Sequence, residues 1–264
     1  MTVKIFTFTI PKGGVGKTLL QANVAVALAK AGKNVVVFDA DPSKAMETIT
    51  GAQVGKTTLS QVINHNLDTN DALYRTDVEN LFLLPSGLGV ESYFDLGPAK
   101  IAKKLEELKC DFLFIDIPFP MGDSAFLALG LSNYLMMILS EDEFSLCVES
   151  GIDLARLAKH VFDCKPAGFI INRITTDKIS DKLVSLVEKA FEAPCVAKLK
   201  EDPLVRKSYG GANKREAYLF LELYPDSEFA AGIKQVAKVM MELPDGTRKP
   251  LGILENVLKQ IKRS

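Results

Sequence analysis

A glycine-rich loop between an apolar strand pattern and a helical pattern is the feature that most constrains this fold. Residues 3–10 are predicted to form a buried strand, and helical periodicity runs over residues 17–30. The loop and the first helical turn consist of Lys12, Gly13, Gly14, Val15, Gly16, Lys17, Thr18 and Leu19. Glycines let backbone N–H groups turn inward on an anion, and the amino terminus of the helix adds positive dipole. This segment is therefore predicted to bind phosphate groups.

The residue types that close the loop indicate a nucleoside triphosphate with its metal ion. In loops of this kind the last lysine reaches the outer phosphates and the next hydroxyl binds Mg²⁺. Lys17 and Thr18 are expected to take these roles, so the predicted cofactors are ATP and Mg²⁺. A second Gly-Lys-Thr, at residues 55–57, lacks the preceding strand and the other glycines. It is predicted to be a turn before a helix capped near Thr57 or Thr58.

Short apolar runs alternate with longer segments of helical period along the rest of the chain. Further strands are predicted at residues 34–39, 80–85, 111–116, 133–139, 167–172 and 195–198, and further helices at residues 98–108, 145–162, 178–191 and 227–241. Several strands are apolar nearly throughout, as parallel strands buried on both faces are. The pattern predicts an α/β fold with a doubly wound, mostly parallel sheet and helices on both faces, as in P-loop NTPases.

Three carboxylates follow predicted strands at one edge of this sheet. Asp39 ends the second strand, Asp41 comes two residues later, and Asp116 ends the strand at residues 111–116. Open α/β sheets bind ligands at the carboxyl ends of their strands. Carboxylates beside phosphate groups hold Mg²⁺ or position the attacking water. Asp41 and Asp116 are therefore predicted to contribute to the metal site together with Thr18, with Asp39 in support.

A polar pair ends another predicted strand at the same edge. Asn172 and Arg173 follow two isoleucines there, and a side-chain amide can pair with adenine as both donor and acceptor. The Asn-Lys-x-Asp pattern of guanine-specific proteins is not found in the sequence. Asn172 and Arg173 are predicted to bind the base, with a loop-capping role for Asn172 as the alternative.

The loop Lys12-Gly-Gly-Val-Gly-Lys-Thr resembles the deviant phosphate loop of the Min/Par family of ATPases, which includes the MinD cell-division positioners and the ParA cargo partitioners. The resemblance implies that Lys12 crosses to the ATP of a partner subunit in a homodimer, where it would join Lys17 in catalysis. Asp39-Ala-Asp-Pro is similar to the family's first switch, which implies that Asp41 orients the attacking water.

The resemblance extends to the base site and has two departures. Asn172-Arg173 looks like the family's Asn-Arg, and residues 201–206, which include Pro203, resemble the segment that packs over adenine. Proline replaces a small residue at position 11 and the usual glycine at position 120. Because proline has no N–H, Pro120 cannot sense the γ-phosphate. The γ-phosphate-sensing role is then either taken over by Gly122 or lost, which leaves the rate of turnover open.

Bulk composition indicates an ordinary protein of the cytoplasm. The formal net charge is −1, which gives no hint of a nucleic-acid surface, so DNA is the less favoured partner. The sequence has no signal-peptide pattern and no apolar run long enough for a spanning helix. Four widely separated cysteines, at positions 110, 147, 164 and 195, are predicted to be reduced thiols.

The carboxyl-terminal residues predict a short basic amphipathic helix after a linker. Residues 1–243 are predicted to form the ATPase domain, and a turn at Pro244-Asp-Gly begins a second segment, 244–264. Within residues 251–264, leucine, valine and isoleucine recur at helical spacing beside basic residues. Such a helix can lie on an anionic membrane, here the inner face of the cell membrane, or dock on its own domain.

These features favour an ATP-dependent dimerising switch of MinD type, in which ATP hydrolysis controls membrane association and spatial positioning, as at a cell-division site. An activating protein partner is an expected part of such a cycle. A ParA-like partitioner that binds DNA is the first alternative. A metallocentre-assembly ATPase would need closely spaced cysteines, which the sequence lacks. A binding module that holds ATP without turnover is the last alternative, suggested by Pro120.

Overall fold

The computed structural model of the protein describes residues 3–88, 93–119, 122–205 and 220–247. Within these ranges eight strands form one sheet in the order β3-β4-β2-β5-β1-β6-β7-β8. Each neighbouring pair is parallel except β3 and β4. The strands are β1 Lys4–Thr9, β2 Val35–Asp39, β3 Tyr74–Arg75, β4 Leu81–Pro85, β5 Phe112–Asp116, β6 Tyr134–Ser140, β7 Lys165–Ile174 and β8 Cys195–Lys200.

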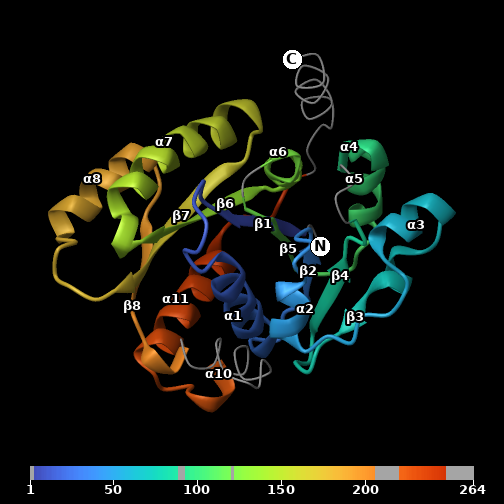
Figure 1. Ribbon diagram of the computed structural model, residues 1–264, viewed down its shortest axis with the longest axis horizontal. Helices are drawn as coiled ribbons and strands as arrows, with labels where there is room; N and C mark the ends of the chain where they lie inside the picture. Colours follow the sequence, from blue (N-terminus) through green and yellow to red (C-terminus); the bar gives the residue numbers. More distant parts are fainter. Residues whose placement is uncertain (1–2, 89–92, 120–121, 206–219, 248–264) are drawn as a thin grey trace.

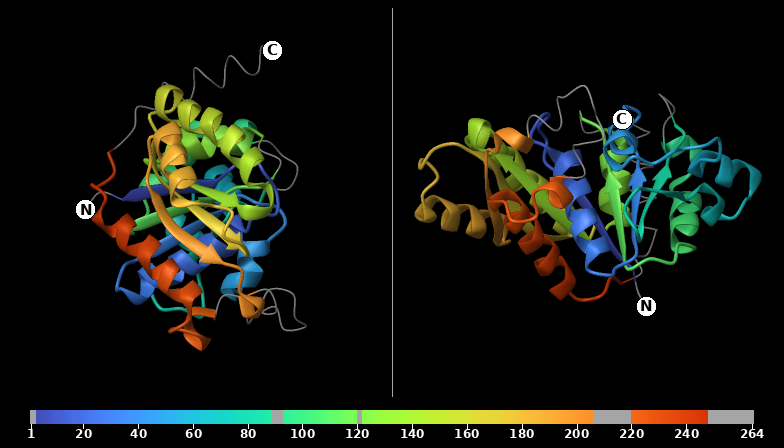
Figure 2. Two further views of the ribbon diagram at one scale, coloured as in Figure 1. Left: turned by 90° about the vertical axis from the view of Figure 1, so that its left-hand side faces the viewer. Right: turned by 90° about the horizontal axis from the view of Figure 1, so that it is seen from below.

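Helices cover both faces of the sheet (Figure 1). One face carries α1 Lys17–Lys30, α2 Ala45–Thr50, α10 Phe220–Leu223 and α11 Glu228–Glu242. The other face carries α4 Tyr93–Leu96, α5 Pro98–Glu106, α6 Asp123–Leu131, α7 Phe144–Val161 and α8 Asp181–Phe191. The view from the β8 side in Figure 2 shows α7 and α8 on one side of the sheet and α11 on the other. The remaining elements, α3 Leu59–His65 and the 3₁₀ turns η1 Thr69–Ala72 and η2 Glu141–Glu143, lie in the connections.

Burial on both faces explains why the central strands are apolar throughout. Every residue of β2, β5 and β6 is buried. Phe114 of β5 packs its ring 5.1 Å from the ring of Phe8 and 6.1 Å from that of Phe6, both on β1. The sheet between the two helical layers is therefore the core of the molecule, and polar side chains gather where its strands end.

The predicted fold class is confirmed, and α1 has the predicted bounds. The other predicted elements differ from the observed ones by one to three residues at an end. The second Gly-Lys-Thr does precede a helix, since Thr58 accepts the Gln61 N–H as the amino-terminal cap of α3. The sequence did not predict β3, α2, α4, α6 or α10. The α6 helix lacks a polar stripe because it is buried on most sides, and the others are too short to show a period.

The start of the predicted tail segment packs on the domain. The Tyr134 hydroxyl donates to the Pro244 carbonyl at 2.8 Å, and the Asn133 amide donates to the Thr247 carbonyl at 2.9 Å. The predicted membrane helix, residues 251–264, lies outside the described residues, so the domain boundary stays a prediction. The described residues include no helix that is long and apolar enough to cross a membrane. They form no disulfide, and Cys110, Cys147 and Cys164 are buried.

Candidate functional site

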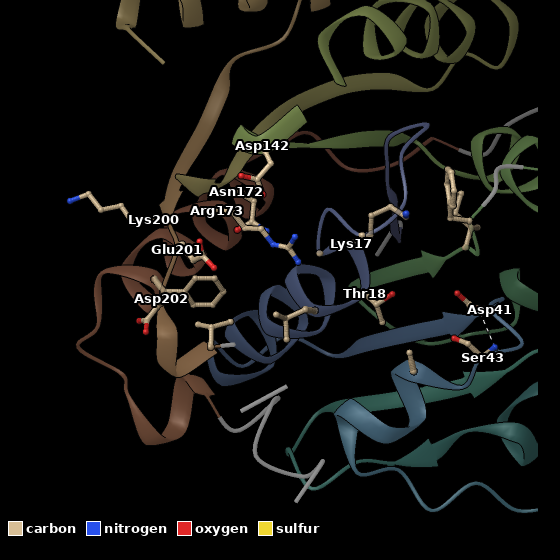
Figure 3. Close-up of a pocket in the computed structure, with 18 residues that line it drawn as sticks. Lys17, Thr18, Asp41, Ser43, Asp142, Asn172, Arg173, Lys200, Glu201 and Asp202 are labelled. Atoms are coloured by element: carbon tan, nitrogen blue, oxygen red, sulfur yellow. Dashed lines mark hydrogen bonds between the residues drawn. The ribbon is translucent and has the colours of Figure 1, made fainter. Parts of the chain in front are cut away.

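A cavity of about 690 Å³ opens at the carboxyl ends of the central strands. Figure 3 shows its labelled side chains, with Asn172, Arg173 and Asp202 at one end, Lys17 and Thr18 in the middle, and Asp41 and Ser43 at the other end. The predicted site residues that line it are Gly14, Gly16, Lys17, Thr18, Leu19, Asp41, Asn172 and Arg173. The structure thus brings together residues from three separate strand ends, at the one edge of the sheet where the sequence analysis expects them.

The glycine-rich loop adopts the conformation that its glycines permit. Gly14 and Gly16 have φ angles of 76° and 94°, in the region that residues with a Cβ rarely adopt. The Asn172 side chain holds the loop from across the sheet, since its amide donates to the Val15 carbonyl at 2.9 Å. A Cβ on Gly16 would lie 2.8 Å from the same amide nitrogen. The loop is therefore preorganised, and glycine at position 16 is required both by the backbone and by the contact.

The side chain of Lys17 is buried beneath the loop. Its ammonium group faces the Lys12 carbonyl and the ring of Phe119. Its Nζ donates to the Lys12 carbonyl at 3.2 Å and lies 5.5 Å from the centre of the Phe119 ring. Burial lowers the pKa of Lys17, and the carboxylates of Asp116 and Asp41 oppose that shift. A buried lysine between carboxylates and a concave backbone is suited to receive an anion.

An acidic group lies under the middle of the cavity, where β2 and β5 end side by side. Asp39 and Asp116 are register partners on these strands. The Thr18 hydroxyl donates to Asp116 Oδ1 at 3.4 Å, while Asp116 Oδ2 is buried without a hydrogen-bond partner among the described residues. Burial, reinforced by the charge of Asp39, raises the pKa of Asp116. Asp39 lies on the same side, and burial raises its pKa to about 7.

This donor set fits a magnesium ion. Mg²⁺ prefers hard oxygen ligands and keeps several of its waters. A hydroxyl and a carboxylate with one buried, unpartnered oxygen meet that preference, and a divalent cation would offset the repulsion between the carboxylates. Thr18 and Asp116 would therefore hold the ion, directly or through water. The predicted metal role of Asp116 has a structural basis, although Asp116 lies beneath the cavity rather than on its lining.

Asp41 sits at the outer end of the cavity in a turn that fixes its orientation. Its backbone N–H donates to Asp39 Oδ1 at 3.1 Å, and its own Oδ1 accepts the Ser43 N–H at 2.8 Å. The side chain is only partly buried and borders the cavity. Its second carboxylate oxygen has no hydrogen-bond partner in the part of the chain that the structure describes, so it can accept a water or a hydrated ion.

The opposite end of the cavity, where a base is predicted to bind, is lined by both charged and apolar side chains. Arg173 borders it with a φ angle of 58°, an unusual conformation for a residue with a side chain. Asp202, Val205 and Phe229 also line this end. Pro203 is exposed and is not among the lining residues, so its predicted contact with adenine stays a prediction.

Lys12 lies outside the cavity and pairs with a carboxylate of its own chain. Its ammonium group is 2.9 Å from Glu143 Oε2, and both side chains are partly exposed. Gly13 likewise lies outside the lining, because the Phe119 ring covers it. The sequence did not single out Phe119, Ser43, Asp142, Glu143 or Phe229. Asp142 and Glu143 follow a predicted strand end, which was a signal that could have found them.

The fold and the site define a P-loop nucleotide-binding protein with a two-lysine loop. Residues 6–213 match the CobQ/CobB/MinD/ParA nucleotide binding domain, and the chain belongs to this family of ATPases. An ATP-binding protein of Methanocaldococcus jannaschii is 30% identical over 266 residues, which cover 99% of this chain and 96% of the relative. The chromosome-partitioning ATPase Soj of Treponema pallidum is 30% identical over 219 residues, with 72% and 86% covered.

Solved structures share the fold. The septum site-determining protein MinD of Pyrococcus horikoshii, complexed with Mg-ADP, superposes with a TM-score of 0.75 at 24% identity, covering 91% of this chain and 96% of that one. MinD of Aquifex aeolicus, in a MinC:MinD complex, gives a TM-score of 0.76 at 20% identity, with 94% and 99% covered. The expected family resemblance is therefore confirmed, whereas the roles of individual residues remain to be tested.

Proposed function

We propose that this chain is an ATP-hydrolysing switch of MinD type, which dimerises when it binds ATP. The observation that carries the proposal is the cavity in which Lys17, Thr18 and Asp41 meet above Asp116. Its length, from Arg173 at one end to Asp41 at the other, suits a base, a sugar and a phosphate chain laid across the strand ends.

The loop would hold the phosphate chain and place the reacting end near Asp41. Backbone N–H groups around Gly14 and Gly16 cradle the inner phosphates, and Lys17 neutralises the outer ones. Mg²⁺ bound at Thr18 and Asp116 supplies neutralisation of the charge that develops on the phosphates. Asp41, fixed by the Ser43 N–H, orients the attacking water through its remaining oxygen. Catalysis of this kind depends on positioning more than on covalent chemistry.

Dimerisation would give Lys12 a function, since this residue does not line the nucleotide cavity of its own chain. Its ammonium group is 2.9 Å from Glu143 and does not line the cavity of its own chain. In the dimer Lys12 leaves Glu143 and contacts the partner's ATP, which makes hydrolysis depend on association. An activating protein partner fits this scheme, and the Aquifex aeolicus relative was solved with MinC.

The spatial part of the proposal rests on the tail. Residues 251–264 carry an apolar stripe and basic residues, which suit the inner face of an anionic cell membrane. One tail binds weakly, whereas the two tails of a dimer bind together with a high effective concentration. ATP would thus control membrane residence and, through it, positioning in the cytoplasm.

A ParA-like partitioner is the second candidate, favoured by the likeness to Soj. In that case the ATP-bound dimer binds DNA in a salt-dependent manner and does not bind anionic vesicles.

The deciding experiment compares Asp41→Ala with Asp71→Ala, which removes an exposed carboxylate on η1. Hydrolysis of Mg-ATP should fall by roughly a hundredfold or more in the first variant and stay unchanged in the second. Both should still bind ATP. Equal hydrolysis rates in the wild type and Asp41→Ala would remove Asp41 from the mechanism. Sedimentation of the wild type with ATP or ADP, with and without anionic vesicles, tests the rest, and a chain lacking residues 251–264 should lose only the vesicle binding.

A further inference from the structure

The Phe119 ring covers the outer end of the phosphate loop. Phe119 follows β5 by three residues and lines the cavity. A Cβ built on Gly13 would come within 2.7 Å of its ring, so the ring rests directly on the glycine backbone. The same ring lies 5.5 Å from the ammonium group of Lys17, within the range of a cation–π contact. The side chain of Phe119 therefore contacts both the Gly13 backbone and the Lys17 ammonium group.

The Gly13 backbone and the Lys17 ammonium group are both expected to contact phosphate when a nucleotide is bound. The lysine of a phosphate loop reaches the outer phosphates, and an ammonium group cannot face an aromatic ring and a phosphate equally well. The ring is 50% exposed, so no tight packing prevents it from moving. The inner part of the cradle, at Gly14, Gly16 and Thr18, lines the open cavity instead of lying under the ring.

We propose that Phe119 sets the discrimination of this site between nucleoside triphosphates and diphosphates. The inference rests on the proposed nucleotide site and assigns it a specificity-determining residue. A diphosphate fills the open inner cradle and leaves the ring on Gly13. A triphosphate extends beneath the ring and displaces it from Gly13 and Lys17. The contacts of Phe119 in the described state thus oppose the terminal phosphate selectively.

The expected size of the effect follows from the contacts that are lost. A partly exposed cation–π contact together with a small apolar contact area corresponds to roughly a three- to tenfold change in an equilibrium constant. Removing the ring should therefore tighten triphosphate binding by roughly three- to tenfold and diphosphate binding by less, because either nucleotide draws Lys17 from the ring but only the triphosphate displaces the ring from Gly13. Leucine at this position retains apolar bulk against Gly13 but has no aromatic face, so Phe119→Leu should lie between the wild type and Phe119→Ala.

Calorimetric titration of the whole chain with Mg-ADP and with a slowly hydrolysed Mg-ATP analogue tests the proposal. The variants are Phe119→Ala, Phe119→Leu and the control Leu186→Ala, which trims an exposed leucine on α8 outside the cavity lining. The proposal expects the ratio of the ADP to the triphosphate dissociation constant to rise in the order wild type, leucine, alanine, with no change in the control. An unchanged ratio, or weaker triphosphate binding by Phe119→Ala, overturns it. A wild type that binds neither nucleotide overturns the proposed function itself, so the two failures are distinguishable.

Discussion

The stability of the nucleotide-free protein should depend on pH through Asp39. This carboxylate is buried at the end of β2, and burial raises its pKa from 3.8 to about 7. The charges of Asp41 and Glu47 add to that shift, while the Asp41 N–H opposes it. Asp116 lies opposite in register, and the ammonium group of Lys17 and the hydroxyl of Tyr93 from α4 are further titratable groups nearby. The carboxylates of Asp39 and Asp116 are thus poorly solvated, which disfavours their charged forms.

The sign of the effect follows from proton binding in the two states. Between pH 4 and pH 7 the unfolded chain releases the Asp39 proton that the folded protein keeps. Because the folded state then binds more protons, its stability falls as the pH rises through this window. One pKa unit corresponds to about 1.4 kcal/mol, so the loss from pH 5 to pH 8 is about 2–3 kcal/mol.

Replacing Asp39 with asparagine should remove this dependence. Asp39→Asn keeps an oxygen to accept the Asp41 N–H and carries no charge at any pH. The free energy of unfolding of the variant minus that of the wild type should therefore grow by about 2–3 kcal/mol between pH 5 and pH 8. The gap can exceed this figure, because the charge of Asp39 also raises the pKa of Asp116.

Urea denaturation in EDTA without nucleotide measures the gap, with Asp71→Asn as the exposed control. A gap that is independent of pH, or that shrinks as the pH rises, would refute the reasoning. Mg-ATP should shrink the gap at pH 8, since a divalent cation beside the carboxylates stabilises their charged forms.

Two further side chains have measurable roles at the ends of the cavity. The Glu141 carboxylate accepts hydrogen bonds from the backbone and hydroxyl groups of the turn that follows Arg173. Glu141→Ala should weaken ATP binding severalfold and leave inorganic tripolyphosphate binding unchanged in titrations, because only the base end is loosened; equal losses would contradict this. Glu143→Gln removes the 2.9 Å ion pair with Lys12. It should raise the ATP-dependent dimerisation constant by about two- to fivefold in sedimentation, the value of a partly exposed pair. An unchanged constant would contradict the proposal that Lys12 leaves Glu143 when the dimer forms.

Local patterns were sufficient to predict the central fold. The run from residue 3 to residue 30 combines strand, glycine loop and helix in one segment, and α1 spans Lys17–Lys30 as predicted. Buried parallel strands such as β2 can be recognised in the sequence as continuous apolar runs. The α6 helix, by contrast, is apolar on most sides and lacks the period that marks a surface helix.

Contacts between distant segments were the part that the sequence could not supply. The Phe119 ring meets Gly13 across more than a hundred residues, and no spacing rule relates them. The predicted contact of Asn172 with a base stays a prediction, with loop capping as its alternative, whereas the sequence did not predict that its amide would donate to the Val15 carbonyl. Such three-dimensional pairings depend on strand order, which motifs do not specify.

Hydrogen bonds hold residues 241–247 against the amino-terminal ends of two central strands. Lys4, Asn133 and Tyr134 stand at the starts of β1 and β6, and they hold the carbonyls of Met241, Thr247 and Pro244. Residues 241–247 therefore lie at the pole opposite the cavity mouth, which opens where the same strands end. A molecule or surface that contacts residues 241–247 would therefore leave the cavity mouth open to nucleotide from the solvent.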